Sequence, residues 1–95
     1  MKATRNQVFG VINGERAYQT DKWGPDEDKK NPVAAFLTFM RYHMRRAEEL
    51  ASTMSDADAA LDQIRKVTTL GVACMETHGA PAREGYGAQI TPDDK

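Results

Sequence analysis

The chain of 95 residues contains little of what marks the common functional classes. Its one cysteine, Cys74, excludes an internal disulfide and a metal site built from cysteines. The net charge is −1, from 13 basic and 14 acidic residues, which argues against a general attraction to nucleic acid or anionic membranes. The longest apolar run, Leu70 to Met75, is broken by Gly71 and is too short to span a bilayer. No apolar stretch follows the basic N-terminal residues, so we expect no signal peptide and a cytoplasmic location.

Short catalytic and cofactor motifs are also missing. The sequence has no P-loop, no dinucleotide-binding glycine fingerprint, no nucleophile elbow and no zinc signature. Its two histidines, His43 and His78, have no third partner at metal-ligand spacing. Because His43 falls among apolar residues, we expect it to be a hydrogen-bonded core residue. No stretch alternates apolar and polar residues for long, so strands are not predicted.

The pattern that is present is helical. Apolar residues recur at intervals of three and four, which predicts helices at about residues 4–22, 32–54 and 56–78. The connection between the second and third helices is so short that they must form an antiparallel hairpin.

Start and stop signals bound these segments. Thr4, with Gln7 three residues later, has the spacing of a capping box. Asn31 is expected to cap the second helix, with Pro32 as its first helical residue, and Ser55 is expected to cap the third. Glycine and then proline end the first and third segments.

The apolar surface of the predicted helices is larger than one hairpin seam can bury. The first helix should cover part of it, and a second copy of the chain is the expected cover for the rest. We therefore predict an all-α fold in which a single domain, residues 1–80, forms a three-helix unit with a long antiparallel hairpin. We expect this unit to assemble into a helical-bundle homo-oligomer, and residues 81–95 to form a flexible tail.

Two polar residues of the first helix, Glu15 and Gln19, lie on the stripe that Val8, Val11 and Ile12 are expected to bury. Polar groups on a core-facing stripe must find partners. One interpretation is an internal hydrogen-bond network that fixes the first helix on the hairpin. The other is the wall of a binding site, and the sequence favours neither.

The stretch from Glu15 to Gly24, with the pattern ERxxQxxKWG, resembles the N-terminal signature of small phage and bacterial MazG-like proteins. The stretch from Ile64 to Glu76 is similar to the C-terminal helix of that family, and more closely to short phage proteins that end in RKVxxLxVACMExHGAP. The resemblance covers roughly residues 7–81. It implies an all-α fold and Mg²⁺-dependent hydrolysis of a nucleoside triphosphate to monophosphate and pyrophosphate.

The family holds Mg²⁺ with the motif E-x-x-E on one helix and E-x-x-D on the next, and this chain departs from that motif. The residues three before and three after Glu48 are Arg45 and Ala51, and the matching positions on the third helix are Gln63 and Lys66. Neither Gln63 nor Lys66 can replace an anionic magnesium ligand. The resemblance therefore predicts a retained fold with a lost metal site.

A cleft that loses carboxylates and gains cations is suited to bare phosphates. We therefore expect a phage-type protein that binds a nucleotide without catalysis and without a cofactor, and so sequesters a nucleotide second messenger of host defence in the host cytoplasm. Tyr18, Trp23 or Tyr42 could stack on the base. The residues predicted to bind the ligand are Glu15, Arg16, Gln19, Lys22, Trp23, Arg45, Arg65 and Lys66.

Three alternatives remain open. The chain could be an active hydrolase whose Mg²⁺ is held by Glu15, Glu48, Glu49 and Asp62, or a phage adaptor that docks a helical face on a host protein. The basic residues could also form ordinary surface ion pairs, because Arg45 is spaced to pair with Glu48 and Glu49. Arg65 is likewise spaced to pair with Asp62 or Asp58.

Overall fold

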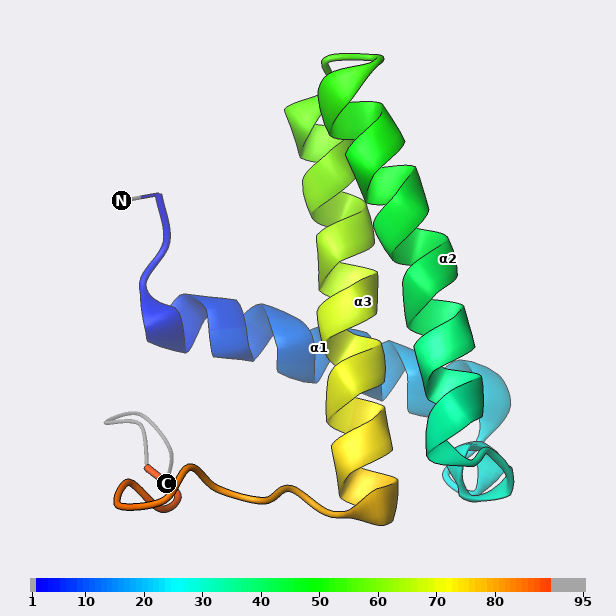
Figure 1. Cartoon of the computed structure of the whole chain (residues 1–95), viewed down its shortest axis with the longest axis vertical. Coiled ribbons are helices and arrows are strands. Elements are labelled where there is room, and N and C mark those ends of the chain that lie inside the picture. Colours follow the sequence, from blue (N-terminus) through cyan, green and yellow to red (C-terminus); the bar gives the residue numbers. More distant parts are fainter. Residues whose placement is uncertain (1, 90–95) are drawn as a thin grey trace.

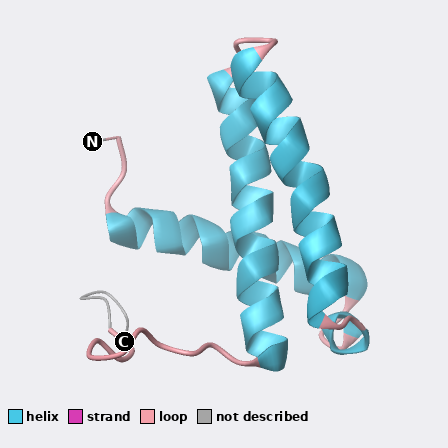
Figure 2. Ribbon diagram, in the orientation of Figure 1, coloured by secondary structure: helices cyan, strands magenta, loops and turns pink. Residues whose placement is uncertain are grey.

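The computed structural model describes residues 2–89. Its elements, in chain order, are α1 (Arg5–Trp23), the short 3-10 helix η1 (Glu27–Lys30), α2 (Val33–Ser52) and α3 (Ala57–His78). The described residues contain no strand, which confirms the predicted all-α class (Figure 2). Within the same residues no helix is both long and apolar enough to cross a membrane.

The first helix begins and ends where the sequence indicates. Gln7 donates its backbone N–H to the Thr4 hydroxyl at 3.1 Å, and the Gln7 side chain accepts from the Thr4 backbone at 2.8 Å. This reciprocal pair is the predicted capping box. The helix ends at Gly24, whose positive φ of 88° is accessible to glycine.

The starts of α2 and α3 differ from the prediction. Pro32, and not Asn31, occupies the N-cap of α2, with no side-chain hydrogen bond to the helix. Asp56, and not Ser55, caps α3, because its Oδ1 accepts from the Ala59 backbone at 3.0 Å. Ser55 has a positive φ of 53° and belongs to the tight turn. The second helix ends at Ser52, two residues before the predicted end at residue 54.

Helices α2 and α3 form the predicted antiparallel hairpin and lie side by side along its length (Figure 1). The seam between them contains most of the core, with Phe36 1% exposed and Thr69 fully buried. The remaining buried apolar residues are Ile12, Ala47, Leu50, Ala60, Val67 and Ala73. Three of these six are alanines, so the single chain buries few large side chains.

Helix α1 crosses the hairpin at a steep angle and packs mainly on α3 (Figure 1). Ile12 is the one residue of α1 that is buried. The expectation that Val8 and Val11 would also be buried is wrong for the single chain, in which their exposed fractions are 46% and 55%. The reason is the crossing geometry, since two crossed helices touch over a short length.

The segment after α3 has no regular structure. Residues 79–89 are all exposed and contain a turn in which Tyr86 donates its backbone N–H to the Arg83 carbonyl at 3.1 Å. The predicted flexibility of the tail, residues 81–95, stays a prediction, and residues 90–95 lie outside the described part of the chain.

Candidate functional site

The eight residues predicted to bind a ligand lie in three places. Four lie at the contact between α1 and α3 and a fifth lies beside it on α3, two lie at the C-terminal end of α1, and one lies on α2. In that order they are Glu15, Arg16, Gln19, Arg65 and Lys66, then Lys22 and Trp23, then Arg45. The structure therefore assembles a polar contact between helices and two separate surface sites.

The first polar bridge between α1 and α3 joins Glu15 to Arg65. The Arg65 Nε donates to the Glu15 carboxylate at 2.8 Å, and the Glu15 side chain is only 13% exposed. Asp62 binds the other side of the Arg65 guanidinium and also lies 3.5 Å from the Lys66 ammonium. The hydrogen bond from Arg65 lowers the pKa of Asp62, and the hydrogen bond to Glu15 is the main cause of the raised pKa of Arg65. The predicted pairing of Arg65 with Asp62 is confirmed.

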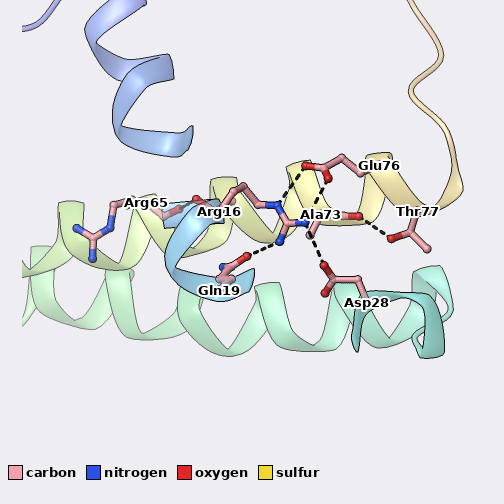
Figure 3. A network of polar contacts seen from close by, with 8 residues as sticks. Arg16, Gln19, Asp28, Arg65, Ala73, Glu76 and Thr77 are labelled. Carbon is pink, nitrogen blue, oxygen red and sulfur yellow. Dashed lines mark hydrogen bonds and ion pairs between the residues drawn. The ribbon is translucent and has the colours of Figure 1, made fainter. Parts of the chain in front are cut away.

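The second bridge centres on Arg16, which points towards Gln19, Asp28 and Glu76 (Figure 3). Its side chain is 17% exposed. Its Nε and one terminal nitrogen donate to the two oxygens of Glu76, on α3, at 3.1 and 3.2 Å. The other terminal nitrogen donates to Gln19 at 2.8 Å, and Asp28 of η1 lies 3.1 Å from the guanidinium. The hydrogen bond to Glu76 is the main cause of the raised pKa of Arg16.

These contacts bear on the two interpretations of Glu15 and Gln19. Glu15 accepts from Arg65, and Gln19 accepts from Arg16, which is itself bound to Glu76. Glu15 therefore binds α1 directly to α3, and Gln19 supports the Arg16 side chain that does the same, which is the internal-network interpretation. The same contacts neutralise Arg16 and Arg65, so their charge is already committed within the chain.

The C-terminal end of α1 carries a different arrangement, which we call the aromatic–lysine cluster: Tyr18, Lys22 and Trp23. The Lys22 ammonium lies 4.8 Å from the centre of the Trp23 ring and 5.7 Å from that of Tyr18. The two rings meet edge to face with centres 6.4 Å apart, and each residue is about half exposed. No carboxylate of the described residues forms an ion pair with Lys22.

Arg45 lies on the outer side of α2 and lines a shallow hollow with Arg41, Tyr42 and Arg46. The expectation that Arg45 would pair with Glu48 and Glu49 is wrong, because Arg46 takes Glu49 as its partner three residues along the helix. Arg45 forms no ion pair within residues 2–89. It lies on a different helix from the aromatic–lysine cluster.

The four carboxylates of the alternative magnesium site are Glu15, Glu48, Glu49 and Asp62. Three of them bind arginines, since Glu15 and Asp62 flank Arg65 and Glu49 pairs with Arg46. Among the described residues, no three His, Cys, Asp or Glu side chains come close enough together to hold a metal ion. The residues that the structure describes therefore do not assemble the donor set that Mg²⁺ needs.

Gln63, at one position where the resembled family has a carboxylate, binds a histidine instead. Its Oε1 lies 2.7 Å from Nδ1 of His43 across the hairpin seam. This contact confirms the predicted hydrogen bond of His43, but the residue is half-buried and does not belong to the buried core. His78 is likewise engaged, with its Nε2 2.8 Å from the Asn31 carbonyl oxygen.

Sequence reasoning did not find the partners of Arg16. Glu76 is 60 residues away in the chain, and no local pattern links the two positions. The aromatic–lysine cluster did carry a signal, because Tyr18 and Lys22 are four residues apart and share one helix face. No protein-family model, curated protein or solved structure matches this chain.

Proposed function

We propose that this protein binds a nucleotide without cleaving it, and that it sequesters a nucleotide second messenger of host defence as a homo-oligomer in the host cytoplasm. The observation that carries the proposal is the aromatic–lysine cluster. Lys22 has no carboxylate partner among residues 2–89, and two half-exposed aromatic rings flank it.

The chemistry of the cluster suits the two parts of a nucleotide. A base can stack on the exposed ring face of Trp23 or Tyr18, which is worth about 1–3 kcal/mol per base. The Lys22 ammonium is a compact point charge that binds phosphate oxygens. Because the ammonium now rests on the ring faces, it can turn towards a phosphate without breaking an ion pair. Binding of this kind needs no Mg²⁺.

The remaining predicted residues have supporting roles in this proposal. Arg16 and Arg65 would have to give up carboxylate partners before they could bind a phosphate. We therefore assign them, with Glu15 and Gln19, to holding α1 in place. Arg45 forms no ion pair within residues 2–89, but its place on α2 makes it a separate anion contact at most.

The test is a thermal-shift screen of the purified protein against nucleoside triphosphates and cyclic dinucleotides, with and without Mg²⁺, and with products separated by chromatography. We expect at least one ligand to raise Tm without turnover and independently of Mg²⁺. Lys22→Ala and Trp23→Ala should each lose most of that shift. The matched control is Lys30→Ala, which removes an exposed lysine whose ammonium already lies 3.4 Å from Glu27.

Two outcomes would overturn this proposal. One is a screen in which no nucleotide raises Tm, and the other is binding that survives both Lys22→Ala and Trp23→Ala. Mg²⁺-dependent release of pyrophosphate would instead support the MazG-like hydrolase. Its metal site would then have to be built from carboxylates of more than one chain, and Glu48→Ala and Glu49→Ala should abolish the activity.

A second candidate function, an adaptor that docks on a host protein, is favoured by an exposed apolar stripe along one flank of α2. Val33, Leu37 and Met44 share one side of this helix, and all three are exposed in the single chain. Exposed apolar stripes of this kind mark protein contacts. The Leu37→Glu variant separates the two functions, since it should leave nucleotide stabilisation intact and abolish docking.

A further inference from the structure

The outer face of α1 carries an uncharged stripe of four residues: Gln7, Val11, Gly14 and Tyr18. Their spacing of four, three and four residues places them in line along the helix. All four are exposed, and more than half of the surface of Val11 and Tyr18 is accessible. The polar bridges to α3 come from other positions of the helix, Glu15 and Arg16, and of the stripe only Gln7 and Val11 border α3.

An apolar groove continues the stripe towards α3. It is lined on the α1 side by Val8, Gly10 and Val11, and on the α3 side by Leu61 and Ile64. The four larger side chains have exposed fractions between 45% and 59%. Stripe and groove share Val11, so together they form one continuous surface that the chain itself leaves uncovered.

We infer that α1 packs antiparallel against α1 of a second copy of this chain through this stripe, with the two-fold axis between positions 12 and 13. The sequence of the stripe is self-complementary about that axis. Val11 meets the partner's Gly14, and Tyr18 meets the partner's Gln7, so a side chain fills the space left by a glycine in both directions.

Two glycines agree with a close approach of this kind. A Cβ built on Gly10 or Gly14 meets no atom within 4 Å, so the fold of the single chain has no steric need for glycine at either position. Glycine inside a helix costs stability relative to alanine. A partner helix that packs closely against the backbone of α1 at these positions would explain why glycine occurs there.

This inference deepens the homo-oligomer in the proposed function, and it does not depend on nucleotide binding. It also places the aromatic–lysine cluster at the edge of the contact, because Tyr18 belongs to both. Each bound ligand would then lie beside the partner chain. Self-association and ligand binding are measured separately, so either can fail alone.

The experiment is sedimentation velocity of the full chain over a range of concentrations without nucleotide. We expect the wild type to form dimers or a larger even-numbered oligomer. Val11→Glu should raise the dissociation constant by about tenfold or more, because it places two buried charges in the interface. The matched control, Asn13→Glu, adds the same charge on an exposed position away from the stripe and should associate like the wild type.

The Gly14→Ala variant tests whether this glycine serves the contact between two chains, because its expected effects on the helicity of α1 and on association are opposite. In the single chain the added methyl meets nothing and should raise the helicity of α1. In the proposed pair it meets the partner's Val11, so association should weaken by about fivefold or more while circular dichroism shows no loss of helix. A monomeric wild type overturns the inference, and so does unchanged association of Val11→Glu or Gly14→Ala.

Discussion

Arg16 and Glu76 face each other in a two-pronged contact, with Nε 3.1 Å from one carboxylate oxygen and a terminal nitrogen 3.2 Å from the other. The pair joins the middle of α1 to the last turn of α3, and Asp28 adds η1 to the same guanidinium. Since Ile12 is the only buried residue of α1, this contact and the Glu15–Arg65 bridge have a large share in holding the helix.

We therefore expect Arg16→Ala to destabilise the fold by about 1–3 kcal/mol, because it leaves Glu76 and Gln19 without their donor at a half-buried site. Urea denaturation at a fixed protein concentration measures the loss. Arg16→Lys should recover only part of it, since an ammonium cannot match the two-pronged geometry.

The control for this clamp is Arg46→Ala. Arg46 binds Glu49 within one helix face, and its side chain is 45% exposed. Removing such a pair should cost no more than about 0.5 kcal/mol. Equal effects of the two alanine variants would contradict the role of Arg16 as the anchor of α1.

The two phenylalanines of α2 provide a prediction about the core. Phe36 is 1% exposed and packs edge-on against His78, whereas Phe39 is 43% exposed. Phe36→Ala should cost about 3–5 kcal/mol, and Phe39→Ala much less in the single chain. Phe36→Leu keeps most of the volume and should remain folded with a loss of about 1 kcal/mol. Thermal unfolding followed by circular dichroism measures these losses. Equal Tm values of the two alanine variants would contradict the difference in burial between Phe36 and Phe39.

The elements of the fold were predictable from local patterns, and their packing was less so. The capping box at Thr4 and the period of three and four residues located α1, because both signals lie within a few residues. The burial of Val8 and Val11 was predicted wrongly because periodicity says which residues share a face and not how long a neighbouring helix runs beside it. The starts of α2 and α3 lie one residue after the predicted ones, since Pro32 occupies the N-cap of α2 and Ser55 belongs to the turn before α3.

The candidate site was predictable in part for the same reason. Tyr18 and Lys22 could be placed together because one helical turn separates them. The contacts of Arg16 with Glu76 and of Arg65 with Glu15 could not, since each depends on how α1 crosses α3. Whether a predicted phosphate-binding arginine is paired with a carboxylate of another helix depends on the tertiary packing. This explains why the eight predicted residues separate into internal bridges and exposed sites.

Acid sensitivity should depend on Asp62. Its pKa is lowered in the folded chain, mainly by the hydrogen bond from Arg65, and the unfolded value is about 3.9. The ionised carboxylate therefore stabilises the fold above that value, and this contribution is lost as the pH falls through the lower folded pKa. The stability difference between wild type and Asp62→Asn should be constant near neutral pH and shrink below about pH 4.

Urea midpoints at pH 7 and pH 3 measure this difference. Asp58→Asn is the control, since Asp58 lies in the first turn of the same helix and is not among the carboxylates that raise the pKa of Arg65. A difference between wild type and Asp62→Asn that stays unchanged at pH 3 would rule out the ion pair as the source of the stabilisation.

The same substitution at two glycines of α3 should act with opposite sign. Gly71 is inside the helix, and a Cβ there would lie 3.6 Å from the Met40 Cε, which is ordinary van der Waals contact. Gly71→Ala should therefore raise stability by about 0.5–1 kcal/mol, because alanine restricts the unfolded chain and favours the helix. Gly79 caps the helix with a φ of 117°, a conformation that alanine rarely adopts, so Gly79→Ala should lower stability by about 1 kcal/mol or more. Because each variant adds one methyl group to the same helix, two shifts of Tm in the same direction would refute the backbone geometry from which both predictions follow.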